Sequence, residues 1–190
     1  MIKAVIFDCF GVLTTDGWKR IREEFFAHDP SKMQHANEID KAVNAGFMDY
    51  DDFIDEISYM TKLSSTDIRA RMNGSEPNDM LFEYIRDKLK PHYKIGMLSN
   101  AADNWLGEMF EPWQVALFDE VVLSYKVGVA KPHTLIYETV VNQLDVTMEE
   151  SIFIDDSERY VIAARDLGMN AINHIDTPDT ITQLEKLLHA

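Results

Sequence analysis

Cysteine and basic residues are scarce in this chain. Its 190 residues include one cysteine, Cys9, and 18 lysines and arginines against 33 aspartates and glutamates. A single cysteine excludes an internal disulfide and is compatible with a reducing compartment. The formal net charge of −15 argues against nucleic acid or an anionic membrane as the main partner, because both are negatively charged themselves. An anionic substrate therefore has to be attracted by positive charge within its own site.

Long apolar runs are missing as well. The N-terminal apolar stretch is interrupted by Asp8 and is too short for the core of a signal peptide or for a membrane span. The chain has no internal repeat, low-complexity tract or long linker. With 46% hydrophobic residues, its 190 residues suffice for one α/β core with a small insertion, and we expect a cytoplasmic protein.

Four segments place polar side chains directly after short apolar runs, and the first of these side chains is Asp8. The run Ala4–Phe7 ends at Asp8, before a turn that contains Gly11. This pattern predicts a buried strand with Asp8 at its carboxyl end, the edge where open α/β sheets bind ligands. Strand alternation should turn Cys9 away from Asp8, which favours a small buried hydrophobe over a catalytic thiol. Taken alone, Asp8 also fits a turn or a helix cap.

The second and third segments carry a hydroxyl and a lysine. The apolar run 94–98 ends at Ser99 and Asn100, where the Ser99 hydroxyl and nearby backbone N–H groups can bind an anion. Ser-Asn is also an ordinary helix cap. In the third segment we expect Pro132 to start a helix through Leu144. A lysine immediately before a helix disfavours the helix dipole, so Lys131 either serves another purpose or is a solvated loop residue.

The fourth segment ends in two adjacent carboxylates. The apolar run 151–154 is followed by Asp155 and Asp156, and then by a helix expected to end at about Leu167. Neighbouring carboxylates repel each other unless a cation or several donors lie among them, so the pair suggests a site for a hard metal ion. A simpler alternative is that Asp156 or Ser157 caps the helix.

Between Asp16 and about Pro77 the hydrophobic pattern changes from strand-like to helical. Apolar residues recur at helical spacing, and 64–67 is typical of a helix start. The two apolar sets are Trp18, Ile21, Phe25 and Phe26, and then Phe53, Ile54, Ile57 and Met60. After Pro77 we expect a helix over 79–89, strands near 93–99, 119–124, 151–155 and 169–173, and a last helix through Leu184 and Leu188.

Taken together, the four segments resemble the motifs of the haloacid dehalogenase-like (HAD) superfamily, whose members are mostly phosphatases. The matching residues are Asp8, Ser99, Lys131 and the pair Asp155-Asp156, in the family's order and over nearly the whole chain. The resemblance implies an α/β fold with a Rossmann-like parallel sheet core, formed by residues 1–15 and 77–190. Residues 16–76 would form a small α-helical cap inserted after the first motif.

These residues predict a Mg²⁺-dependent hydrolase of a small phosphorylated metabolite. Asp8 would attack phosphorus and form an aspartyl-phosphate, while Mg²⁺ and Lys131 offset the charge repulsion. Asp8 and Asp156 suffice as side-chain ligands of Mg²⁺. The resemblance adds the Phe10 carbonyl as a ligand and places Asp155 at or beside the metal. Besides the catalytic residues Asp8, Ser99 and Lys131, it implies phosphate contacts from Ser99, Lys131 and the backbone N–H groups near Phe10, Gly11 and Asn100.

Phe10 departs from the phosphatases of this family, most of which have a second Asp there for general acid–base catalysis. Another residue would have to supply the proton, or the leaving group needs little protonation, or the protein is weakly active or inactive. Haloacid dehalogenases are the second interpretation, because they carry an aromatic residue at this position, need no metal and release halide from carbon. They generally lack the acidic pair, however, and have Thr in place of Val12, so we favour a phosphatase.

A regulator that binds a phosphorylated metabolite or a protein is the third interpretation. Retention of the other catalytic positions argues against it. Tyr160 is a smaller departure, because family members often have Asn in this helix, near the metal. The sequence predicts neither the substrate's identity nor the oligomeric state.

Overall fold

A five-stranded parallel sheet forms the centre of the protein, for which a computed structural model describes residues 1–73, 76–103 and 106–189. The strand order is β3-β2-β1-β4-β5, and every neighbouring pair is parallel. The strands are β1 (Ala4–Phe7), β2 (Lys94–Ser99), β3 (Glu120–Leu123), β4 (Ser151–Asp155) and β5 (Asn170–Asn173). The α/β class and the strand positions predicted from the sequence are thereby confirmed.

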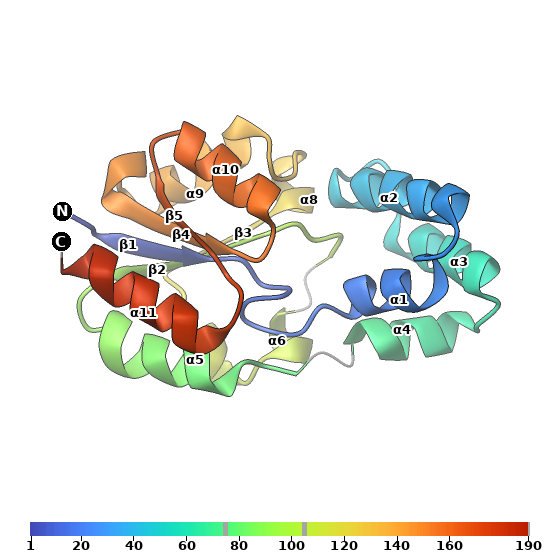
Figure 1. Cartoon of the computed structure of the whole chain (residues 1–190), viewed down its shortest axis with the longest axis horizontal. Coiled ribbons are helices and arrows are strands. Elements are labelled where there is room, and N and C mark those ends of the chain that lie inside the picture. The colour runs from blue at the N-terminus through green and yellow to red at the C-terminus, as the bar shows by residue number, and fades with distance from the viewer. Residues whose placement is uncertain (74–75, 104–105, 190) are drawn as a thin grey trace.

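Helices cover both faces of the sheet because alternate residues of each strand face opposite sides (Figure 1). In β1, Val5 and Phe7 pack in one apolar cluster, while Ala4 and Ile6 pack in another. The first cluster includes residues of α5 (Asp79–Tyr84), the π-helical turn η1 (Ile85–Leu89) and α11 (Thr177–Leu188). The second includes residues of α9 (Thr134–Gln143) and α10 (Glu158–Asp166).

The parallel register brings the predicted site residues to one edge of the sheet. Phe7 pairs with Met97 on one side and with Ile154 on the other, so β1 lies between β2 and β4. Asp8 follows immediately, and its N–H donates to the Ile154 carbonyl at 2.8 Å. The carboxyl ends of β1, β2 and β4 therefore meet where open α/β sheets bind ligands.

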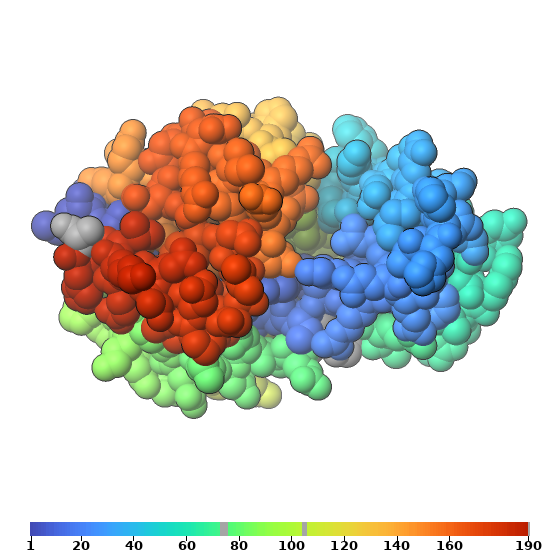
Figure 2. Space-filling model, viewed as in Figure 1, coloured from blue at the N-terminus to red at the C-terminus, as the bar shows by residue number. Residues whose placement is uncertain are grey.

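Four helices form a layer beside this edge, which we call the helical layer: α1 (Gly17–Phe25), α2 (Pro30–Asn44), α3 (Tyr50–Thr61) and α4 (Ser65–Asn73). It stands as a separate lobe, blue to blue-green in Figures 1 and 2. Trp18 packs edge-on against Phe26 and Phe53 within its own apolar cluster. The chain enters and leaves the layer side by side, since Thr14 bridges to Pro77, close to the predicted limits of the insertion.

The remaining elements are short, and one predicted boundary is wrong. They are α6 (Leu106–Met109), α7 (Pro112–Val115), α8 (Ser124–Val127) and the 3-10 turn η2 (Met148–Glu150). The helix predicted to start at Pro132 starts at Thr134, because the His133 ring accepts the Leu135 N–H and caps it instead. Lys131 is therefore three residues before α9 rather than immediately before it. Within the described residues, no helix is both long and apolar enough to cross a membrane.

Gly17 allows the first and last helices of the helical layer, α1 and α4, to approach each other closely. A Cβ at this position would lie 2.5 Å from the Arg71 carbonyl oxygen and 3.0 Å from the Met72 Cα, so α1 and α4 would have to separate. We expect Gly17→Ala to lower the free energy of unfolding by about 1–3 kcal/mol. Urea denaturation measures this change. Gly107→Ala is the control, because its Cβ meets no heavy atom within 4 Å, and an equal loss in both variants would contradict the prediction.

Candidate active site

A buried lysine joins two of the predicted carboxylates. The Lys131 Nζ lies 2.8 Å from Asp8 Oδ1 and 2.6 Å from Asp155 Oδ2. The side chains of Lys131 and Asp155 are 1% and 0% exposed, so water contributes little to holding these charges. Each carboxylate also accepts a hydrogen bond from the backbone. Asp8 Oδ1 accepts the Cys9 N–H at 2.7 Å, and Asp155 Oδ1 accepts the Ser157 N–H at 2.8 Å.

Burial and charge act against each other in this cluster. Burial, together with the nearby Asp155 charge, raises the pKa of Asp8 well above its usual value, and Lys131 only partly offsets this effect. Burial likewise raises the pKa of Asp155 against the opposing effect of Lys131. For Lys131, burial alone would lower the pKa, but the charges of Asp155 and Asp8 outweigh burial and raise it. The lysine is therefore a permanent cation at neutral pH.

Asp156 lies beside this cluster but points outward. It is half-buried, and its Oδ2 lies 3.3 Å from the Nζ of Lys19 in α1. Gly11 packs closely against the Asp156 side chain, because a Cβ at position 11 would lie 2.6 Å from the Asp156 Cγ. One carboxylate oxygen each from Asp8, Asp155 and Asp156 lie within 4.8 Å of one another. Three hard oxygen donors at this spacing fit a Mg²⁺ ion.

Asn100 holds the lysine loop in place. Its Oδ1 accepts the Lys131 N–H at 2.8 Å, and its Nδ2 donates to the Lys131 carbonyl and to the Tyr160 hydroxyl, both at 3.3 Å. The Lys131 Nζ also lies 5.1 Å from the centre of the Tyr160 ring and 5.5 Å from that of Phe153. Sequence reasoning missed this positioning role of Asn100, and it treated Tyr160 only as a departure from the family.

The structure places the other predicted residues less directly at the site. Ser99 is fully buried at the end of β2, where its hydroxyl donates to the Asn100 carbonyl at 3.4 Å. The Gly11 N–H donates to the Thr14 carbonyl at 2.7 Å, so binding phosphate through this N–H would require that bond to open. Cys9 is fully buried in the core, and burial raises the pKa of its thiol. The predicted hydrophobic role of Cys9 is confirmed.

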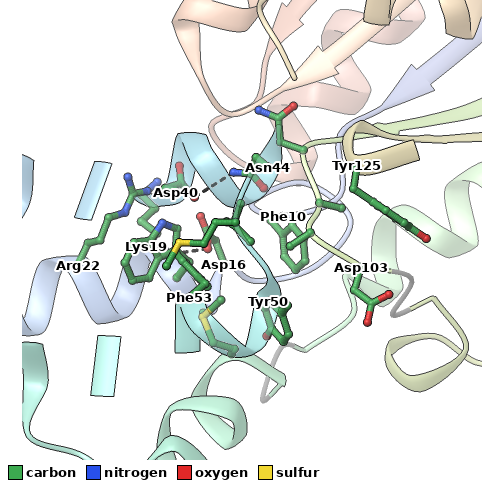
Figure 3. Close-up of a pocket in the computed structure, with 18 of the residues that line it drawn as sticks. Phe10, Asp16, Lys19, Arg22, Asp40, Asn44, Tyr50, Phe53, Asp103 and Tyr125 are labelled. Carbon is green, nitrogen blue, oxygen red and sulfur yellow. Dashed lines mark hydrogen bonds between the residues drawn. The ribbon is translucent and has the colours of Figure 1, made fainter. Parts of the chain in front are cut away.

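A cavity of about 1320 Å³ connects the strand edge to the helical layer. Asp8, Lys131 and Asp156 line it from the core. Phe10 lines it as well (Figure 3). Its other wall combines charged and apolar side chains, among them Asp16, Lys19, Arg22, Asp40, Tyr50 and Phe53. Sequence reasoning missed the charged members. Their available signal was the helical spacing of polar residues directly after the first motif.

Lys131 should stabilise the protein only while its carboxylate neighbours are ionised. Lys131→Met removes a cation from a buried cluster, and we expect a loss of roughly 3–5 kcal/mol in the free energy of unfolding at pH 7.5. The folded-state pKa values of Asp8 and Asp155 would then lie further above their unfolded values. As pH falls through those raised values, the carboxyls take up protons in the folded state, so the deficit should shrink at pH 5.5.

Urea unfolding at pH 7.5 and 5.5 measures this change. The control is Lys126→Met, which removes an exposed lysine of α8. A deficit of equal size at both pH values would contradict the assignment of Lys131 to this cluster.

Comparison with known proteins matches most of the chain to a family of hydrolases. A family model described as haloacid dehalogenase-like hydrolase matches residues 2–168. A sesquiterpene phosphatase of Aspergillus oryzae is 28% identical over 193 residues, covering 98% of this chain and 96% of its own. The chain also spans between 8% and 39% of the length of several longer curated relatives.

Two solved structures share the fold of this chain over most of its length. A HAD family enzyme of Bacteroides thetaiotaomicron, solved with magnesium and inorganic phosphate, is 26% identical with a TM-score of 0.70, over 90% of this chain and 93% of its own. The L-2-haloacid dehalogenase of Xanthobacter autotrophicus, with chloropropionic acid covalently bound, is 22% identical with a TM-score of 0.67, over 90% and 76%. At that identity the second likeness shows the fold alone.

Proposed function

Because the chain belongs to the haloacid dehalogenase-like hydrolase family, we propose that it is a Mg²⁺-dependent phosphatase of a small phosphorylated metabolite. The observation that carries this proposal is the set of three carboxylates, Asp8, Asp155 and Asp156, which offer oxygens within 4.8 Å of one another. Asp8 and Asp156 line the cavity, and Asp155 is fully buried beside them. A metal-independent dehalogenase has no use for such a set, since uncompensated negative charge raises the pKa of the nucleophile.

Asp8 is the proposed nucleophile. One of its carboxylate oxygens attacks phosphorus, the ester P–O bond breaks, and the alcohol leaves with a proton. Water then attacks the phosphorus of the aspartyl-phosphate, the bond from phosphorus to Asp8 breaks, and phosphate is released. Lys131 offsets the negative charge that gathers as the carboxylate approaches the phosphate, and Asn100 keeps its loop in position.

Asp8 and Asp156 are the proposed side-chain ligands of Mg²⁺, with Asp155 and the Phe10 carbonyl beside them. The bound ion would supply positive charge to the phosphate oxygens and to the Asp8 carboxylate. Asp155 is already bonded to Lys131 and to the Ser157 N–H, which suits a supporting role. Asp156 points outward and is bonded to an exposed lysine, which an arriving cation can displace.

The helical layer is the proposed cap, and it supplies the substrate-binding wall. Ser99, Gly11 and the backbone around Phe10 and Asn100 are the proposed phosphate contacts. The mixture of apolar and charged side chains in the cavity is compatible with a phosphorylated organic molecule. The expected cytoplasmic location stays a prediction.

Haloacid dehalogenase chemistry is the second candidate, because an aromatic side chain occupies position 10. The two candidates differ in their metal requirement. A screen of phosphorylated metabolites and 2-haloacids, each with Mg²⁺ and with EDTA, separates them. Phosphate release that EDTA abolishes supports the phosphatase, halide release unaffected by EDTA supports the dehalogenase, and no turnover of either class favours a binding protein.

Asp8→Asn should abolish turnover and leave the fold intact. The amide keeps the shape of the carboxylate but loses its nucleophilic charge and much of its affinity for the metal. Phosphate release measures activity, and circular dichroism checks the fold. Retained activity in a preparation free of wild-type enzyme would show that another residue is the nucleophile.

Asp155 and Asp156 should contribute unequally to Mg²⁺ binding. We expect Asp156→Asn to weaken Mg²⁺ binding more than Asp155→Asn, because Asp156 is proposed to bind the metal directly and Asp155 to orient its neighbours. Calorimetric titration of Mg²⁺ into both variants measures the affinities. Equal losses in the two variants would refute this division.

A further inference from the structure

Phe10 leaves the proposed reaction without a proton donor at the usual place. The leaving alcohol needs a proton, and the water that attacks the aspartyl-phosphate has to lose one. Phenylalanine does neither. We propose that Asp16, at the start of the helical layer, is the general acid and base of this reaction, an inference that rests on the proposed phosphatase function.

Asp16 lies where two cavities meet at the catalytic edge. It lines the large cavity together with Asp8 and Phe10. It also lines an adjacent cavity of about 480 Å³ together with Gly11 and Asp156. Figure 3 shows its carboxyl group on the side of the Phe10 ring that faces α1 and α2. A phosphate ester bound at Asp8 would thus share its cavity with Asp16.

Lys19 connects Asp16 to the last motif, because its N–H donates to Asp16 Oδ1 at 2.9 Å and its Nζ lies 3.3 Å from Asp156 Oδ2. The Asp16 charge contributes, after burial and Asp8, to raising the pKa of the Cys9 thiol. The Asp156 charge in turn acts on Asp16. Cys9 and Asp156 belong to loops that follow different strands, and Asp16 is within electrostatic reach of both.

Only one of the two carboxylate oxygens of Asp16 caps a helix. Oδ1 accepts the Lys19 N–H at 2.9 Å and caps α1. Within the described parts of the chain, Oδ2 has no hydrogen-bond partner. The carboxyl is therefore held by one oxygen while the other remains available to a substrate, as positioned proton transfer requires.

The surroundings of Asp16 favour its protonated form. Burial raises its pKa, and Asp156 adds to this effect, while the Lys19 N–H and the charges of Arg22 and Lys19 oppose it. Asp40 of α2 is a further nearby negative charge. A carboxyl group whose pKa is raised toward the working pH transfers protons more effectively than an ordinary surface aspartate.

Other groups in the cavity are less suited to the role. None of the six histidines lines the large cavity in the described part of the chain. Asp51 is paired with Arg69. Asp49, Glu23 and Glu108 are exposed. Asp40 accepts a hydrogen bond from Asn44 within α2. Asp103 lies on the opposite side of Phe10 from Asp16 (Figure 3).

Asp16 gives up one proton and recovers one proton in each catalytic cycle. As the ester P–O bond breaks, protonated Asp16 gives its proton to the departing alkoxide and becomes a carboxylate. In the second step that carboxylate takes a proton from the water whose oxygen attacks phosphorus. The bond between phosphorus and Asp8 then breaks, which regenerates the Asp8 carboxylate and leaves Asp16 protonated again.

Asp16→Asn is the discriminating variant. Asparagine caps helices about as well as aspartate, so α1 is kept while the proton is removed. With Mg²⁺ present, we expect kcat/KM for simple alkyl phosphates to fall by about 10²–10⁴-fold. Aryl phosphates with acidic leaving groups should lose much less, so the dependence on leaving-group pKa becomes steeper. The high-pH limb of the wild-type profile, which reports the acid, should disappear.

Asp49→Asn is the matched control, because Asp49 also caps a helix of the helical layer and lines the same cavity. It should leave the leaving-group slope unchanged. Asp16→Asn combined with Phe10→Asp should flatten the slope again by restoring a carboxyl group beside the phosphate.

The outcomes separate this inference from the function on which it rests. Active wild-type enzyme with the same slope in Asp16→Asn overturns the role of Asp16 and leaves the phosphatase intact. Equal losses on alkyl and aryl phosphates overturn it too, because they indicate a positional role. Wild-type protein that hydrolyses no phosphate ester overturns both proposals.

Discussion

The ion cluster of Lys131 with Asp8 and Asp155 is the interaction on which the rest of the site depends. Two carboxylates at the ends of adjacent strands would repel each other in a nearly dry environment, and each would tend to take up a proton. The Lys131 ammonium, 2.8 Å and 2.6 Å from them, partly offsets this tendency and joins a third segment to the two strands. In the proposed reaction, the same cation lies beside the incoming phosphate. A nucleophile that must be both buried and charged therefore requires the lysine before it can react.

The sheet makes this cluster possible, and the helical layer encloses it. Parallel register places Asp8 and Asp155 next to each other, while Asn100 at the end of β2 positions the lysine loop. The helical layer contributes a second cation, Lys19, whose bond to Asp156 spans the division between the layer and the core. Because that bond is partly exposed, it contributes little stability on its own. It does show that α1 reaches the Asp156 side of the cavity.

Local patterns predicted the strands and their ends, because a buried parallel strand is a continuous apolar run and its final polar residue is visible in the sequence. The positions of Asp8, Lys131, Asp155 and Asp156 followed from such runs and from the family resemblance. The start of α9 did not, since the choice between Pro132 and His133 as the cap depends on a side-chain hydrogen bond. The position of Asp16 could not be predicted from the sequence either. Its place beside the catalytic edge results from how the helical layer packs against the core, which no local pattern records.

An aromatic residue at position 10 and an acid at position 16 have a joint consequence for turnover. A proton donor on the strand loop moves with the nucleophile, so chemistry proceeds wherever the helical layer lies. A donor at the first residues of that layer is in reach only while the layer lies against the core. Asp16 sits directly after the Thr14–Pro77 crossing, so a small rotation there displaces its carboxyl relative to Asp8. Proton transfer would then be tied to closure of the cavity, and a substrate that held the helical layer closed would be hydrolysed faster than one of equal leaving-group acidity that did not.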